Sequence, residues 1–235
     1  MNKLSPYLAW IVTLVTPVVL ILSVVRILLF PWFLNVEYNM AGFPPDSYGF
    51  TQPDRLRWAG YAVNYLVNDA DISYLGDLRF PDGVQAPPES CQTSYEGGDC
   101  NRLYNDRELS HMQDVKLVTQ KVLDVWRYAL FLLGLLGIGA SFGNWGNAYR
   151  FALGRGGWIT AFLCGTVVVL SLLSFGMVFV TFHDLFFAQG SWTFLYSDTL
   201  IRLFPVRFWQ DIFLYALGVP GLIGVGLGLA FRKRE

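Results

Sequence analysis

The two histidines of this chain, His111 and His183, are the side chains best suited to chemistry. Imidazole titrates near neutral pH, so one ring can accept a proton and another can donate one. Each histidine lies at the end of a long apolar segment, where an ionisable group is costly and favours a functional explanation. We therefore predict an acid–base pair, with solvated or structural helix-end histidines as the alternative.

Acidic neighbours add to the case for catalysis. Glu108 and Asp114 lie three residues on either side of His111, and Asp184 follows His183. A carboxylate that accepts from one ring nitrogen fixes the tautomer and leaves the other nitrogen free to move a proton. Ordinary ion pairing is the alternative for each acid.

Arg107, one turn before His111, is suited to binding a phosphate, a carboxylate or a developing oxyanion, with ion pairing again as the alternative. Other chemistries lack their motifs. The sequence has no His-Glu-x-x-His zinc pattern, no Gly-x-Ser-x-Gly elbow and no phosphate-binding loop. We expect no metal and no cofactor.

The elements that position these residues are membrane helices. Hydrophobic residues make up 54% of the 235 residues and charged residues 15%, and the apolar residues form long blocks. Backbone amides in lipid need internal partners, which favours helices. We predict an all-α integral membrane protein with four transmembrane helices, at residues 8–30, 126–142, 158–182 and 212–231.

Two outer segments connect these spans. Residues 35–104 are polar yet rich in aromatics, and we interpret them as a folded cap, with a helix over residues 52–67 and a turn at residues 81–83. From Asn105 the sequence stays compatible with one helix until Gly134, so the second membrane helix should emerge from the bilayer carrying His111. The connection at residues 183–210 is aromatic and should lie along the interface.

Basic residues predict the orientation. Lys3, Arg150, Arg155 and the basic residues at positions 232–234 flank the spans on one side, which makes both termini cytoplasmic and puts both histidines at the outer leaflet. The first block is too long for a signal peptide and is read as retained. A net charge of −1 gives no nucleic-acid signal.

Cysteine usage agrees with this orientation. Cys91 and Cys100 lie in the cap, where an oxidising compartment allows a disulfide; a metal site is the weaker alternative. Cys164 falls within the third span and is expected to be a small buried residue.

The motifs around the histidines resemble a known family. Arg107-Glu108, His111-Met112 and Asp114-Val115 are followed by Phe182-His183, Phe186-Phe187, Trp192 and the run at residues 200–205. This pattern is similar to the lipoprotein intramolecular transacylase family of bacterial four-helix membrane proteins. The resemblance covers residues 106–211 and the topology of the rest; a long cap with two cysteines departs from compact members.

The resemblance implies an activity. Such an enzyme of the bacterial cytoplasmic membrane moves an O-linked acyl chain of a diacylglyceryl-cysteine lipoprotein onto its own N-terminal amine, giving the lyso-form. His111 and His183 match the family's essential histidines; we assign the base to His111 and the acid to His183, or the reverse. Membrane lipids and a diacylated lipoprotein are the implied partners. The alternatives are a non-catalytic protein that binds lipid or a partner protein, and a related outer-leaflet lipid acyltransferase or esterase.

Overall fold

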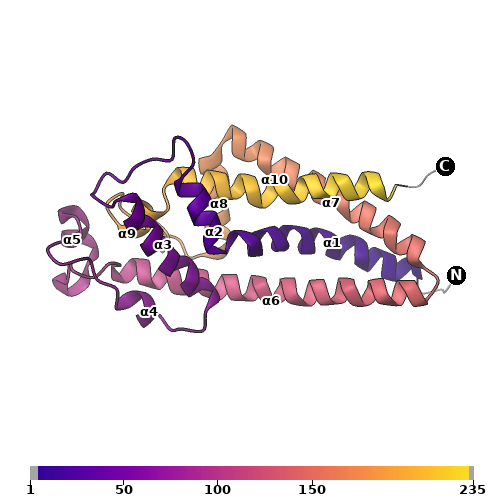
Figure 1. The fold of residues 1–235 in the computed structure, drawn as a ribbon, viewed down its shortest axis with the longest axis horizontal. Coiled ribbons are helices and arrows are strands. Elements are labelled where there is room, and N and C mark those ends of the chain that lie inside the picture. Colours follow the sequence, from indigo (N-terminus) through magenta and orange to yellow (C-terminus); the bar gives the residue numbers. More distant parts are fainter. Residues whose placement is uncertain (1–4, 233–235) are drawn as a thin grey trace. The chain divides into compact units, whose positions relative to one another are not determined.

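The computed structural model describes residues 5–232, apart from the side chain of Glu96, and within them it is helical with one isolated β-bridge, Arg79 to Arg102. The elements are α1 (Ser5–Leu28), α2 (Pro31–Tyr38), α3 (Gln52–Val67), α4 (Ser73–Gly76), α5 (Pro88–Ser94), η1 (Glu96–Gly98), α6 (Asp106–Phe142), α7 (Gly146–Leu173), α8 (Phe175–Phe186), α9 (Thr199–Leu203) and α10 (Val206–Ala230) (Figure 1).

Four of these helices, α1, α6, α7 and α10, are long and apolar enough to cross a membrane. This confirms the predicted all-α membrane fold with four spans. Large apolar side chains on them are exposed, as lipid-facing residues should be, and Phe142, Leu172 and Leu222 are examples.

The limits of the helices differ most from the prediction at the second and third spans. The second predicted span is the last part of α6, which runs for 37 residues without a break. The third, expected at residues 158–182, is divided: α7 ends at Leu173, Ser174 has the non-helical angles φ −157° and ψ 84°, and α8 continues from Phe175. Hydropathy does not indicate this break, because the residues before and after it are both mostly apolar.

The chain divides into two compact units, and each is described by itself. Unit 1 consists of Met1–Leu28, Lys121–Val178 and Ile212–Glu235 and holds the membrane helices. In it α1 packs along α7, where Ala9 and Val12 are buried with Ala152. Trp126 of α6 donates to the Ser23 hydroxyl of α1 at 2.9 Å. These contacts hold α1 between two neighbours.

Glycines allow the close approach of helices in unit 1. A Cβ on Gly157 of α7 would lie 2.5 Å from the carbonyl oxygen of Gly224 in α10, and a Cβ on Gly156 would lie 2.5 Å from Cβ of Thr16 in α1. Larger residues at either position would push helices apart. Small residues thus allow α7 to pack closely against α1 and α10, as is common for helices in membranes.

Unit 2 consists of Leu29–Gln120 and Phe179–Asp211 and contains the predicted cap. The helix α3 has the predicted bounds, and a capping box of Thr51 and Asp54 fixes its start. The predicted turn is present, with Val84 N–H donating to Pro81 at 2.9 Å. A disulfide joins Cys91 and Cys100, whose Cα atoms are 5.3 Å apart. The core includes Trp58, Tyr65, Leu75, Leu103 and Tyr104.

Unit 2 also buries two neighbouring carboxyl groups. Glu37 of α2 has no exposed surface, and neither of its carboxyl oxygens accepts a hydrogen bond from an N–H or hydroxyl group of the described residues. Burial and the adjacent Asp211 raise the pKa of Glu37 to about 7. Asp211 accepts from Arg207 Nε at 2.5 Å. The neutral form of Glu37 is therefore favoured below about pH 7.

Candidate active site

His111 lies in the second turn of α6, whose start is fixed by its own sequence. Asn105 accepts from the Glu108 N–H, and Glu108 accepts from the Asn105 N–H, both at 2.9 Å. This reciprocal pair satisfies donors at the helix start as a capping box does. His111 follows one turn later and is 8% exposed.

Glu108 also connects α6 to α9. Its second carboxylate oxygen accepts from the Leu200 N–H at 2.6 Å, in the first turn of α9. Both oxygens of this fully buried carboxylate thus bind backbone N–H groups. Glu108 positions the helix that carries His111; the carboxylate does not orient the His111 ring.

His183 lies in the last turn of α8 and is 6% exposed. Its Nδ1 is 2.8 Å from the Phe179 carbonyl oxygen. A carbonyl only accepts, so Nδ1 carries the hydrogen and Nε2 is the nitrogen that gains or loses a proton. Burial lowers the pKa of His183, against the opposing effects of the Phe179 carbonyl and Asp184. The neutral ring with a free Nε2 lone pair is therefore favoured.

The two imidazoles lie close together inside a shell of aromatic rings. Their centroids are 6.4 Å apart and their planes 24° apart. This distance suits two groups that act on one reacting carbonyl. The aromatic neighbours of one or both rings are Phe179 (4.0 Å from His183), Trp192 (4.8 Å from His183), Phe187 (5.0 Å from His111) and Phe194 (5.4 Å from His111).

Two buried polar atoms in this shell lack partners among the described residues, His111 Nδ1 and Trp192 Nε1. A buried polar group without a partner costs about 1–3 kcal/mol, so such atoms are often explained by a ligand or by function. Neither atom is hydrogen-bonded to another described residue, so each retains an unused hydrogen-bonding group beside the ring pair.

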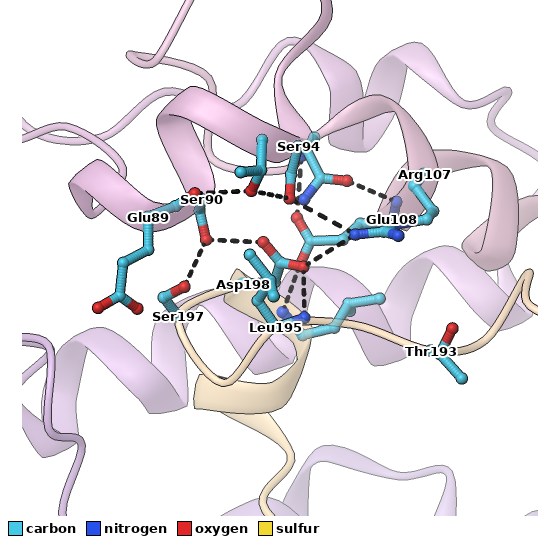
Figure 2. A network of polar contacts seen from close by, with 12 residues as sticks. Glu89, Ser90, Ser94, Arg107, Glu108, Thr193, Leu195, Ser197 and Asp198 are labelled. Carbon is cyan, nitrogen blue, oxygen red and sulfur yellow. Dashed lines mark hydrogen bonds and ion pairs between the residues drawn. The ribbon is translucent and has the colours of Figure 1, made fainter.

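A second polar network fixes the loop that carries Phe194 (Figure 2). The buried carboxylate of Asp198 accepts from the Leu195 N–H at 2.9 Å and from the Ser90 hydroxyl of α5 at 2.7 Å. Ser90 also contacts the Ser197 hydroxyl at 2.9 Å. Through these bonds the disulfide-bearing helix of the cap holds the loop beside the histidines.

Arg107 belongs to this network. Its guanidinium lies 3.7 Å from Asp198, 3.5 Å from the Ser94 hydroxyl and 5.8 Å from the Phe194 ring centroid. The side chain is 43% exposed, which leaves part of the guanidinium open to solvent. Ion pairing, the alternative reading of Arg107 in the sequence, is what the structure contains.

The remaining predicted residues stay apart from the rings. Asp114 is half-buried, and among the described residues it makes no hydrogen bond or ion pair with His111. The Nδ1 atom of His111 has no partner among these residues. Asp184 is exposed and acts on His183 through its charge. Ser90 and Asp198 were not predicted, although an Asp directly before the apolar run at residues 199–204 is a helix-start signal.

Comparisons with known proteins bear on this arrangement. An uncharacterized protein of Aquifex aeolicus strain VF5 is 25% identical over 220 residues, covering 87% of this chain and 90% of that protein. The structure of the membrane-integral lipoprotein intramolecular transacylase Lit from Bacillus cereus has a TM-score of 0.64 at 18% identity, covering 98% of this chain and 94% of that one. A variant of it with one histidine replaced by alanine gives 0.67 at 17% identity, covering 98% and 93%.

The fold and the comparisons define a class: a membrane-integral, all-helical protein with four apolar spans, similar in structure to a transacylase. The family described as lipoprotein intramolecular transacylase Lit matches residues 9–209. The chain belongs to this family.

Proposed function

We propose that this protein is an intramolecular transacylase of the outer leaflet of the bacterial cytoplasmic membrane. It moves an O-linked acyl chain of a diacylglyceryl-cysteine lipoprotein to the N-terminal amine of the same cysteine. Family membership supports the reaction class, and the buried pair of imidazoles 6.4 Å apart is the observation that carries the assignment of the site. Both termini are cytoplasmic in this proposal.

The amine must reach the ester carbonyl without its extra proton. An N-terminal amine has a pKa near ~8, so a neutral imidazole is a suitable base. The nitrogen attacks the carbonyl carbon, the new C–N bond forms, and the C–O bond to glycerol breaks. The extra proton of the ammonium form is released to solvent before attack. From the neutral amine, one proton then passes from nitrogen to the glycerol oxygen, so the transfer step itself neither gains nor loses a proton.

The hydrogen bond from His183 Nδ1 to Phe179 favours His183 as the base, and we propose that the same ring then acts as the acid. Because Nδ1 is already donating, Nε2 is the basic atom, and the carbonyl stabilises the imidazolium once Nε2 takes the proton. His183 then returns this proton to the leaving glycerol oxygen. His111 and Trp192 offer buried polar groups to the oxyanion, which suits their lack of protein partners.

Two further features support this chemistry. The aromatic shell limits water, which would hydrolyse the ester instead of allowing attack by the amine. Ester and amine belong to one molecule, so holding the lipid in a folded-back conformation supplies much of the rate enhancement.

The test is to express this chain in a bacterial host that makes diacylglyceryl lipoproteins without N-acylation. Transfer leaves the total mass of the lipopeptide unchanged, so tandem mass spectrometry has to locate the acyl chain on nitrogen. We expect N-acyl, mono-acylglyceryl cysteine with the wild type. His183→Gln and His111→Gln should lower this product by at least ~100-fold, the usual contribution of acid–base catalysis.

A matched control is Asp114→Asn, which alters the same turn region of α6 without touching either ring. Diacylglyceryl cysteine that stays unmodified in cells containing folded wild-type protein would contradict the proposal. Equal product from a folded double histidine variant would support a binding role for the site instead.

A further inference from the structure

A cavity of about 430 Å³ lies among the helix ends of unit 1, far along the sequence from either histidine. It is bounded by the first turns of α1, the first half of α7 and the end of α10. The residues that line it are Ala9, Ala148, Phe151, Gly154, Arg155, Trp158, Gly228, Phe231 and Arg232. The walls are apolar except for two guanidinium groups.

These two arginines have no acidic partner in the cavity. No carboxylate is among the lining residues, and the α6–α7 connection has no acid. The single acid of unit 1 within the described residues, Asp124, is paired with Arg127 at 2.6 Å. Within residues 5–232, therefore, no carboxylate neutralises Arg155 or Arg232, and both side chains are exposed and open to an anion.

The aromatic residues around this cavity are of the kind found at a membrane surface. Arg155 lies over the Trp10 ring at 4.6 Å, and Trp158 is half exposed on the cavity wall. Tryptophans and arginines at the ends of spanning helices are typical of the headgroup level. Gly228 makes room here, because a Cβ on it would lie 2.5 Å from Trp158 Nε1.

We propose that this cavity binds the phosphate headgroup of an anionic membrane lipid, with Arg155 and Arg232 on the phosphate and the aromatic wall against the upper part of an acyl chain. A soluble anion would use the two charges but leave the apolar walls uncovered; a lipid uses both. Basic pockets between membrane helices bind anionic headgroups in this way. The site is separate from the proposed transacylation and does not depend on it.

The test is native mass spectrometry of the full-length protein in detergent with phosphatidylglycerol added. We expect one phosphatidylglycerol to be retained in preference to phosphatidylcholine. Arg155→Gln with Arg232→Gln should weaken retention by roughly 30-fold, since each arginine near an anionic surface contributes about a factor of five. Ala148→Phe should weaken retention with both arginines intact, because it fills the cavity.

Arg150→Gln is the matched control, since Arg150 is exposed in the same helix but does not line the cavity. A loss equal to that of Arg155→Gln alone would show diffuse charge attraction and overturn the site. Inorganic phosphate or glycerol phosphate that displaces the lipid at equal concentration would overturn the lipid as the ligand. His183→Ala protein should retain the lipid as the wild type does, so failure here and failure of the transacylase assay are distinguishable.

Discussion

Replacing Glu37 by Gln should remove a pH dependence of stability from this protein. The side chain is fully buried, and its pKa is raised from 4.5 to about 7 by burial and by Asp211. A folded-state pKa above the unfolded value means that the folded protein holds the proton more tightly. The stabilisation is complete below about pH 4.5 and is lost as the pH rises through about 7.

The size of the effect follows from the shift. A change of one pKa unit corresponds to ~1.4 kcal/mol, so the shift from 4.5 to about 7 corresponds to at most about 3 kcal/mol. For a chain of this length, ~1 kcal/mol moves the melting temperature by ~2–4 °C. Wild-type protein should therefore melt roughly 6–12 °C lower at pH 8 than at pH 5 from this group alone.

The assay is thermal unfolding of detergent-solubilised protein followed by the fluorescence of its eight tryptophans between pH 5 and pH 8. Glu37→Gln keeps the shape of the neutral acid, so its melting temperature should vary much less with pH. Glu89→Gln is the control, since Glu89 is an exposed glutamate of the cap. Parallel pH profiles for wild type and Glu37→Gln would refute the assigned role of Glu37.

Three further predictions concern the polar groups around the site. Glu108→Ala leaves the N–H groups of Asn105 and Leu200 without an acceptor and should lower the free energy of unfolding by about 2–4 kcal/mol. Thermal or chemical denaturation measures this loss. A loss below ~0.5 kcal/mol would contradict the bridging role of Glu108. Asp198→Asn should loosen the loop that carries Phe194 and lower the transacylation rate by about tenfold. His183 should remain protected from a histidine-modifying reagent in this variant. An unchanged rate would argue against positioning by this network. Cys91→Ser should reduce stability by about 2–3 kcal/mol, since the disulfide closes a short loop of the cap, and reduced wild-type protein should show the same loss.

Much of the fold could be predicted because it depends on local patterns. Apolar blocks identified the four spans, and Pro53, Asp54 and the helical spacing of the apolar residues after them predicted α3. The α6 helix was predicted to continue from the outer segment into the membrane because no Pro or Gly interrupts its first part. These features need no knowledge of distant contacts.

The candidate site depended on contacts that sequence spacing does not contain. The i−3 position of Glu108 suggested a partner for His111, but backbone N–H groups at two helix starts compete for that carboxylate, and one of them is 92 residues away. His183 is instead hydrogen-bonded to the backbone carbonyl of Phe179. Because every residue has a backbone carbonyl, no residue type in the sequence could indicate this partner. The break at Ser174 interrupts a long, mostly apolar run in which hydropathy alone predicts one continuous helix.

The bond between Glu108 and Leu200 also sets when the site can form during synthesis. His111 is made early, but its helix start receives this partner only after α7 and α8 have been synthesised. Until Leu200 and the loop at residues 187–198 have been synthesised, Glu108 lacks its partner in α9, and His111 lacks Phe187 and Phe194. A nascent chain that stops before this loop therefore cannot assemble the aromatic shell around the two imidazoles.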